Sequence, residues 1–308
     1  MHRVLLPFEF SEPESVEEAV ALIDGDRARA LAGGVDLVLK MRLRKIVPER
    51  VVSLQRIPGL DYVRPDGQLG SGALCIGALA TLREVEQSAA VLQGWPLLAE
   101  AMGSVVSMQT KMMGTIAGNL CVGTPASDVA PALYALGARI RIAGRNGDRE
   151  IPVEEFYLDA GRTAVGPHEL VTEIVVPAPA AGSAGAFLKL SKTSEDIAKV
   201  NVAAVVALQA GTCLHARIAI GAAAPTPVRA TAAEQALEGR AFDAAAIAAA
   251  AEAAARAVCP ISDVRSTAEY RKEMVRVLVR DALCKAGARG GASLSDQTGG
   301  DVPAGKEA

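Results

Sequence analysis

Residues 111–138 read KMMGTIAGNLCVGTPASDVAPALYALGA, and this stretch decides how the rest of the chain is interpreted. Gly114, Gly118 and Gly123 lie in a run of small, apolar and hydroxyl-bearing residues, which predicts a loop with little side-chain bulk and an accessible main chain. Glycines let a main chain approach a ligand closely, and consecutive free N–H groups at a loop or a helix start suit an anion. The stretch is therefore a candidate phosphate-binding loop.

A second glycine loop lies far upstream, where LAGGVD at 31–36 joins a candidate strand at 27–32 to a candidate helix at 35–44. Two such loops could clamp one diphosphate. Neither fits the dinucleotide fingerprint G-x-G-x-x-G, and the pattern G-x-x-x-x-G-K-[ST] does not occur in the sequence. A glycine turn between a strand and a helix is often only structural, so either loop alone is weak support for a nucleotide site.

Five segments resemble, in the same order, the FAD-binding medium subunits of molybdenum hydroxylases, the family of xanthine dehydrogenase and aerobic carbon monoxide dehydrogenase. They are AGGVDL at 32–37, TIAGN at 115–119, TPASDVAP at 124–131, SEDIAKV at 194–200 and SDVRSTAEYRKEM at 262–274. The resemblance spans about residues 4–287, and five ordered motifs are much more specific than one glycine loop.

The resemblance implies an α+β fold with a two-lobed FAD-binding domain of the PCMH type over residues 1–178, with lobes at about 1–57 and 58–178. A C-terminal domain of the carbon monoxide dehydrogenase flavoprotein type, with an antiparallel sheet plus helices, would follow over 184–287. The composition break PAPAAGSAG at 177–185 supports this division. Residues 288–308 lack apolar content and are expected to form a disordered tail.

Local patterns predict several elements of these domains. Capping boxes are expected at Ser15/Glu18 and Thr81/Glu84, and Asn146-Gly147 predicts a hairpin turn. In the C-terminal part we expect strands at 186–190, 200–209 and 214–221 and helices at 229–237, 243–258 and 266–285.

The same resemblance implies which residues bind FAD. The diphosphate and ribitol would lie against Ala30, Leu31, Ala32, Gly33, Gly34, Val35 and Asp36 and against Thr115, Ala117, Gly118 and Asn119. Thr124 and Asp128 fall where the family also contacts FAD, and Lys199 matches a basic position that approaches the flavin. Asp128 is open to two interpretations, an N-cap of the following helix or a partner for a ribose or adenosine hydroxyl. Lys199 is either a solvated lysine at a strand end or a cation that stabilises the reduced flavin.

Some residues depart from the family pattern. Val35 stands where a hydroxyl or imidazole residue is common, so one hydrogen bond to FAD is expected to be missing. Ala117 replaces the first glycine of TIGGN, and its methyl group requires a negative φ. Lys192-Thr193 stands where an arginine pair is frequent, which leaves the route to the final electron acceptor open.

Composition restricts the remaining functions. The net charge of −3 and the dispersed basic residues argue against nucleic-acid binding. The apolar segment at the N-terminus is interrupted at Pro7 and is too short for a signal peptide. Glu252 and Arg256 interrupt the alanine-rich run at 244–258, which argues against a membrane span. A cytoplasmic protein is therefore expected. Five cysteines without a C-x-x-C pair and three histidines predict no metal in this chain. In the resembled family, the 4-hydroxybenzoyl-CoA reductase branch inserts a cysteine-bearing loop after the second glycine motif to hold an extra cluster. Here that region holds only Cys121, which argues against this branch.

No residue here has the pattern of a substrate-activating acid, base or nucleophile. In the resembled family a large molybdopterin subunit oxidises the substrate, a small subunit carries two [2Fe-2S] clusters, and the assembly is typically a dimer of heterotrimers. The chain would then accept electrons from the nearer cluster and release them to NAD, a quinone, oxygen or another carrier. Two alternatives stay open: a free-standing flavin-dependent oxidoreductase of the same fold superfamily, and a non-catalytic assembly subunit that has lost the cofactor.

Overall fold

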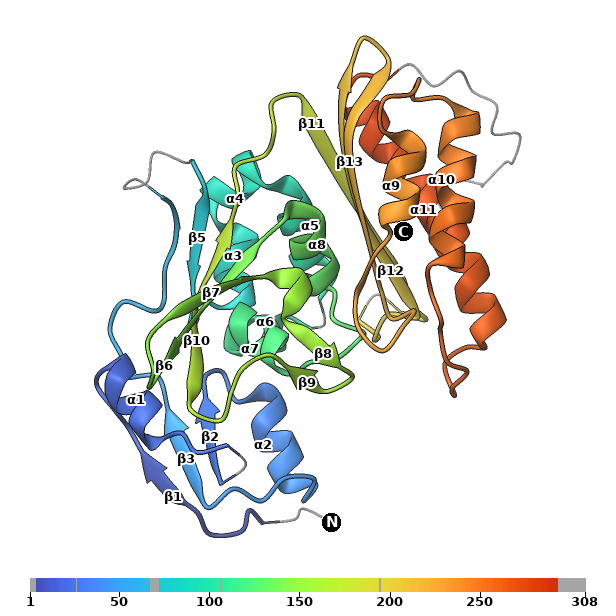
Figure 1. Ribbon diagram of the computed structural model, residues 1–308. Helices are drawn as coiled ribbons and strands as arrows, with labels where there is room; N and C mark the ends of the chain where they lie inside the picture. Colours follow the sequence, from blue (N-terminus) through green and yellow to red (C-terminus); the bar gives the residue numbers. More distant parts are fainter. Residues whose placement is uncertain (1–3, 26, 67–71, 106, 194, 293–308) are drawn as a thin grey trace, which may run out of the picture.

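Three larger sheets, each with its own helices, and one two-stranded ribbon make up the described part of the chain (Figure 1). The computed structural model of the protein describes residues 4–25, 27–66, 72–105, 107–193 and 195–292. The α+β architecture implied by the resemblance is confirmed. The expected tail falls mostly outside the described residues, although its first two residues continue a helix that ends at Arg289.

The N-terminal lobe is a three-stranded parallel sheet with two helices. Its elements are β1 (Glu9–Ser11), α1 (Val16–Leu22), β2 (Ala28–Leu31), α2 (Val35–Arg42) and β3 (Arg50–Ser53), and the strand order is β1-β3-β2. The predicted strand–loop–helix around the first glycine loop is therefore correct. The capping box predicted for α1 forms only in half: Ser15 Oγ accepts from Glu18 N–H at 3.2 Å, but the Glu18 carboxylate accepts from Glu14 N–H instead.

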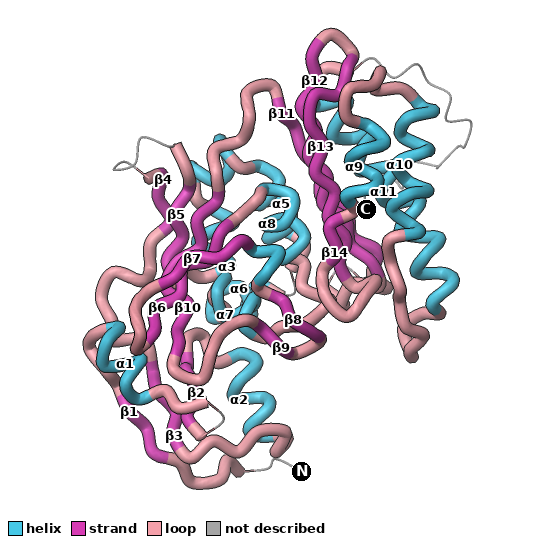
Figure 2. The backbone as a smooth tube through the Cα atoms, viewed as in Figure 1, coloured by secondary structure: helices cyan, strands magenta, loops and turns pink. Residues whose placement is uncertain are grey.

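The middle lobe has helices on one face of a five-stranded antiparallel sheet (Figures 1 and 2). The sheet runs β4 (Val63–Pro65), β5 (Leu74–Gly77), β10 (Glu169–Val176), β6 (Arg139–Gly144) and β7 (Arg149–Pro152). The helices are α3 (Leu82–Gln87), α4 (Ala89–Gly94), α5 (Pro96–Gly103), α6 (Met108–Met113), α7 (Ile116–Cys121) and α8 (Val129–Leu136). The Thr81/Glu84 capping box and the hairpin turn between β6 and β7 form as predicted.

A short 3-10 helix, η1 (Val153–Glu155), and a two-stranded ribbon, β8 (Tyr157–Asp159) with β9 (Arg162–Thr163), connect β7 to β10. The ribbon was not predicted. It projects from the edge of the middle lobe above α2 (Figure 1).

The C-terminal part is an antiparallel sheet of β11 (Ser183–Leu190), β12 (Val200–Gln209), β13 (Thr212–Gly221) and β14 (Val228–Arg229). One face is covered by α9 (Thr231–Leu237), α10 (Ala244–Arg256) and α11 (Ala268–Arg289), and the other packs on α5 and α8 of the middle lobe (Figure 1). Phe187, Ala203 and Ala219 on this inner face belong to the apolar core of the middle lobe. Within the described residues, no helix is both long enough and apolar enough to cross a bilayer.

The N-terminal lobe is tied to the middle lobe at the loop before β10. Gly25 N–H donates to Pro167 O at 2.7 Å, and His168 Nδ1 lies 2.8 Å from Ile23 O. Leu170 of β10 also joins the small apolar core around α1. These contacts hold the two lobes side by side at the edge formed by α1 and the loop before β10.

A buried ion pair joins the middle lobe to the C-terminal sheet. Asp128, at the start of α8, accepts hydrogen bonds from Lys189 Nζ at 2.7 Å and from Asn201 Nδ2 at 2.6 Å. The Lys189 and Asp128 side chains are only 7% and 8% exposed, so solvent screens them little. Lys189 Nζ also donates to Ser104 O at 2.9 Å.

Replacing Lys189 by Met leaves the Asp128 carboxylate buried without its cation, so the free energy of unfolding should fall by about 3–5 kcal/mol at neutral pH. Burial raises the pKa of Asp128, and Lys189 and Asn201 oppose that rise. Without Lys189 the pKa rises further, so the folded state holds a proton more strongly than the unfolded state and the deficit shrinks on acidification. Urea denaturation followed by the fluorescence of Trp95 at several pH values measures the change.

The D128N/K189M double variant is the matched control, because it removes the buried charge altogether. It should recover part of the stability that K189M loses at neutral pH. A K189M deficit that does not change with pH and is not relieved in the double variant would contradict a buried charged pair.

Candidate cofactor site

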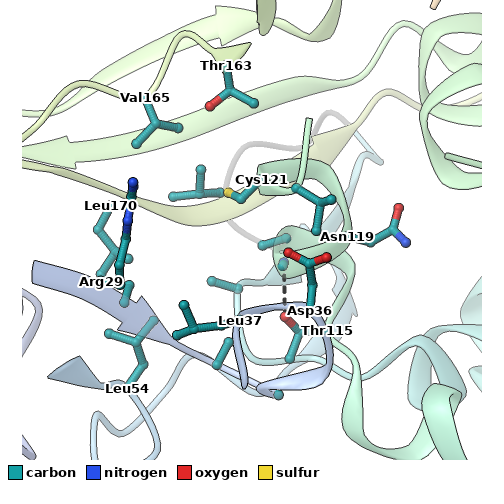
Figure 3. A pocket seen from close by; sticks show the side chains of 18 of the residues that line it. Arg29, Asp36, Leu37, Leu54, Thr115, Asn119, Cys121, Thr163, Val165 and Leu170 are labelled. Carbon is teal, nitrogen blue, oxygen red and sulfur yellow. Dashed lines mark hydrogen bonds between the residues drawn. The ribbon is translucent and has the colours of Figure 1, made fainter. Parts of the chain in front are cut away.

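A cavity of about 760 Å³ lies between the N-terminal and middle lobes (Figure 3). It is bounded by residues within 28–37 at the end of β2 and the start of α2, by residues within 114–122 around α7, and by residues within 161–171 between the ribbon and β10. Small-molecule and cofactor sites measure about 300–1,000 Å³. The space is therefore large enough for a nucleotide cofactor.

The two glycine loops are in direct main-chain contact at Gly33. A β-carbon built on Gly33 would lie 1.7 Å from the Met113 carbonyl oxygen and 3.0 Å from Gly114 Cα. Only a residue without a side chain lets the two main chains approach so closely. The next residue, Gly34, has a φ of +71° and is the N-cap of α2. The two distant loops thus meet beside the cavity.

Backbone donors gather where the loops meet. Within the described part of the chain, the N–H groups of residues 33–37 donate no hydrogen bond to the protein, and neither do those of Thr115 and Ala117. The first N–H groups of a helix have no intrahelical acceptor, and the partial positive charge of the helix start attracts anions. Because these residues also line the cavity, their donors suit a phosphorylated ligand.

The second glycine stretch, predicted as an open loop, is partly helical. Thr115 caps α7, and its Oγ1 accepts from Gly118 N–H at 3.0 Å (Figure 3). A β-carbon on Gly118 would lie 2.8 Å from this oxygen, so glycine leaves room for the cap. Ala117 has the negative φ of a helical residue, as its methyl group requires.

The third wall of the cavity was not predicted from the sequence. Gly161, at the tip of the ribbon, donates its N–H to Gly123 O at 2.8 Å and so holds the ribbon against the end of α7. Thr163, Val165 and Leu170 line this wall (Figure 3). Their segment contains the turn-forming residues Gly166-Pro167, which mark a loop but give no indication of a ligand.

The carboxylates that line the cavity are paired with cations. Asp36 lies 2.7 Å from Lys40 Nζ, and Glu169 Oε2 lies 2.7 Å from Arg149 Nη2. The hydrogen bond from Arg149 holds the pKa of Glu169 below its ordinary value, so this side chain is no proton donor at neutral pH. Cys121 lines the cavity and is exposed, and desolvation by the neighbouring protein raises the pKa of its thiol above the ordinary value.

Ten of the fourteen predicted binding residues line this cavity: Ala30, Ala32, Gly33, Gly34, Val35, Asp36, Thr115, Ala117, Gly118 and Asn119. Leu31, Thr124, Asp128 and Lys199 are not among the lining residues. Asp128 occupies the N-cap position of α8, but its side chain makes no capping hydrogen bond because it binds Lys189 and Asn201. Ser127 caps α8 instead, through a hydrogen bond of 3.1 Å from Ala130 N–H to Ser127 Oγ.

Ser127 also connects the cavity wall to the C-terminal sheet. Its Oγ donates to Asn119 Oδ1 at 2.7 Å, and its carbonyl oxygen accepts from Asn201 Nδ2 at 3.1 Å. Asn201 in turn holds Asp128, so one chain of hydrogen bonds runs from Asn119 on α7 to β12. Within the described residues, no three His, Cys, Asp or Glu side chains are grouped to hold a metal ion.

Two glycine turns that touch beside a cavity of this size fit a nucleotide-cofactor-binding protein. Comparison with family models specifies the class. Residues 6–179 match the FAD binding domain in molybdopterin dehydrogenase, and residues 185–286 match the CO dehydrogenase flavoprotein C-terminal domain. The chain therefore belongs to the family of FAD-binding medium subunits of molybdenum hydroxylases, the flavoprotein subunits of multi-subunit oxidoreductases.

Individual relatives agree over nearly their full length. The carbon monoxide dehydrogenase medium chain of Hydrogenophaga pseudoflava is 36% identical, covering 92% of this chain and 98% of that protein. The 6-hydroxypseudooxynicotine dehydrogenase complex subunit alpha of Paenarthrobacter nicotinovorans is 33% identical, covering 91% and 94%. A solved structure of the Hydrogenophaga pseudoflava carbon monoxide dehydrogenase contains a chain that superposes with a TM-score of 0.89 at 38% identity, covering 93% of this chain and 99% of that chain.

The Gly33→Ala substitution should reduce the FAD content of the protein purified with its partner subunits. Its methyl group cannot coexist with the Met113 carbonyl, so the two loops must separate, at a cost of about 1–3 kcal/mol for overpacking. If the separation acts on the cofactor site, FAD affinity falls by roughly 5- to 150-fold. Flavin released by denaturation is quantified against protein.

Gly94→Ala is the matched control, because a β-carbon at Gly94 meets no atom within 4 Å and this glycine has no positive φ. It should retain the wild-type flavin content. Full flavin occupancy in Gly33→Ala would show that the contact between the loops is not needed for binding.

Proposed function

We propose that FAD binds in the cavity between the two lobes, with its diphosphate against the start of α2 and the start of α7. The observation that carries this proposal is the contact at Gly33, which brings both sets of unpaired backbone N–H groups to one cavity. Main-chain N–H donors suit a diphosphate, because their hydrogen bonds and the dipole at a helix start stabilise its negative charge.

The remaining lining residues fit the other parts of the cofactor. Leu37, Leu54, Leu82, Val165 and Leu170 supply apolar surface. Such surface suits an aromatic ring system. Ala117 causes no backbone strain in α7. Val35 contributes only a hydrocarbon side chain, so the donors at this position are those of the main chain.

Bound FAD would supply the electron-transfer chemistry, and the residues of this chain would bind and orient it. Among the described residues, two acidic side chains line the cavity, Asp36 and Glu169. Each of them is paired with a cation. The Cys121 thiol stays protonated at neutral pH. The part of these lining residues in the proposed function is to shape the site, while the bound cofactor would supply the electron transfer.

The chain accepts electrons from a [2Fe-2S] cluster of a small partner subunit and passes them to an external acceptor such as NAD, a quinone or another carrier. A large molybdopterin subunit oxidises the substrate, and the complex is a cytoplasmic dimer of heterotrimers. The support is the match over nearly the full length of medium chains from carbon monoxide and 6-hydroxypseudooxynicotine dehydrogenases. Relatives named for such different compounds share this subunit type, so the substrate is selected by another chain.

Purification of the complex through a tag on this chain tests the assembly. The preparation should contain flavin, iron, acid-labile sulfide and molybdenum in constant ratio across the peak of a size-exclusion column. A flavin-containing chain that elutes alone and reduces its own substrate would instead support a free-standing flavoenzyme. A chain that elutes with partners but without flavin would support an assembly subunit.

Lys199, Thr124 and Asp128 are proposed to act at the edge of the site. Arg271 Nη1 donates to both Lys199 O and Ala222 O at 3.0 Å, and Ala222 N–H donates to Pro125 O at 2.7 Å. The main chain at Lys199 is therefore linked to the segment that leaves α7. In this proposal the Lys199 ammonium group would act on the bound flavin, while Asp128, through Lys189 and Asn201, holds the segment in place.

The Lys199→Met substitution should lower the reduction potential of the bound flavin, because a cation near the ring favours its reduced form. Lys272→Met, which removes an exposed lysine of α11, is the control and should leave the potential unchanged. Spectroscopic redox titration of the purified complex measures both variants. Equal potentials in wild type and Lys199→Met would leave Lys199 as a solvated side chain at a strand end.

A further inference from the structure

An exposed apolar surface lies on α2 and α6, next to the contact between the glycine loops. Six large hydrophobic side chains on or next to these two helices are 40–64% exposed: Val35, Leu39, Leu43, Met108, Met112 and Met113. Three of them, Val35, Leu39 and Met113, line one groove, and the name α2–α6 face is used for this groove together with the exposed side chains beside it. Val35 and Leu39 lie four residues apart on α2, as Met108 and Met112 do on α6, so each pair shares one helix face. The two segments are more than sixty residues apart in sequence, and the contact of Gly33 with Met113 joins them.

The α2–α6 face is concave. A groove of about 260 Å³ lies between α2 and the end of α6, lined by Val38, Leu39, Arg42 and Met113 together with Gly33, Gly34 and Val35. Gly33, Gly34 and Val35 line both this groove and the larger cavity. The other four residues line the groove but not the larger cavity. The size of the groove suits an inserted side chain rather than a second cofactor. Exposed apolar patches with such a groove mark interaction sites.

The charge of the α2–α6 face is opposite to that of the chain. Segments 35–45 and 108–113 carry five basic residues and one acidic residue, whereas the whole chain has a net charge of −3. Lys111 is buried against Glu86, and Lys40 pairs with Asp36. Arg42, Arg44 and Lys45 are exposed at the end of α2 and form a basic rim beside the apolar side chains.

We propose that the α2–α6 face is the docking site for another subunit of the complex, one that presents an acidic rim around a protruding apolar side chain. The apolar side chain enters the groove between Leu39 and Met113, and the acidic rim meets the basic residues at the end of α2. Methionine side chains suit such a site because they adapt their shape to the partner. This inference rests on the proposed multi-subunit assembly and specifies which face of the chain takes part in it.

The same observations disfavour two other occupants. A second copy of this chain in a two-fold arrangement would bring the basic rim against itself, and like charges across an interface repel. A lipid bilayer favours a broad amphipathic helix with aromatic anchors. Here α2 has only 8 residues, the six apolar side chains include no aromatic residue, and the face is a groove.

Leu39→Glu tests the proposal in the co-expressed complex. It places a carboxylate in the groove, where it repels the acidic rim of the partner, and Leu39 does not line the cofactor cavity. The dissociation constant of the other subunits should rise roughly tenfold or more. Leu92→Glu is the matched control, because Leu92 on α4 is equally exposed at 54% and lies outside the face. It should assemble as wild type does.

Flavin content, light scattering of the isolated chain, and sedimentation with phosphatidylserine vesicles separate the outcomes. Weak assembly of Leu39→Glu with a wild-type melting temperature supports the docking site. The affinity of the wild-type chain for the other subunits should also fall at high salt, and Arg44→Gln should make this salt dependence less steep. Undiminished assembly of Leu39→Glu overturns the docking site. The proposal also fails if the wild-type chain self-associates or binds vesicles and, of the variants, only Leu39→Glu loses that property. If wild-type protein holds flavin but binds no other subunit, the proposed assembly fails together with this inference while the cofactor site stands.

Discussion

The contact between Gly33 and the carbonyl of Met113 is the constraint on which the candidate cofactor site depends. The two lobes are built on separate sheets, and they share the small apolar core around α1, to which Leu79, Ala143 and Leu170 of the middle lobe contribute. The glycine contact joins the lobes at one place. The hydrogen bonds of Gly25 with Pro167 and of His168 with Ile23 join them at another. The cavity keeps its width because it is held at both places.

Much of the fold could be predicted because its signals are local. Glycine and asparagine turns, alternating apolar residues and Thr81 with its capping partner depend on neighbours within a few residues, and these elements form where expected. The helix α7 was missed because two of its six residues are poor helix formers, Gly118 and Asn119. It is stabilised by the Thr115 cap and by tertiary contacts such as Ile116 N–H to Ala80 O at 3.1 Å. A sequence window does not show such distant partners.

The sequence predicts the two walls of the cavity that carry glycine motifs. It does not predict the third wall. Residues 161–171 line the cavity with ordinary loop and strand residues, whose role follows only from the way β8 and β9 fold over α7. Asp128 shows the opposite case. It lies within a recognisable motif, yet its carboxylate is occupied by Lys189, sixty-one residues further along the chain. A conspicuous polar residue in a motif can serve the junction between domains as well as a ligand.

The hydrogen bonds from Asn119 through Ser127 to Asn201 and Asp128 have a consequence for how the molecule responds to force. They make the C-terminal sheet a mechanical support of the cavity wall, since β12 cannot slide along α8 without pulling on α7. A load applied to the far side of that sheet by a neighbouring chain would be transmitted through Asn201 and Ser127, which do not line the cavity, to Asn119, which does. The shape of the pocket would then be tuned from a distance, by stiffness rather than by contact.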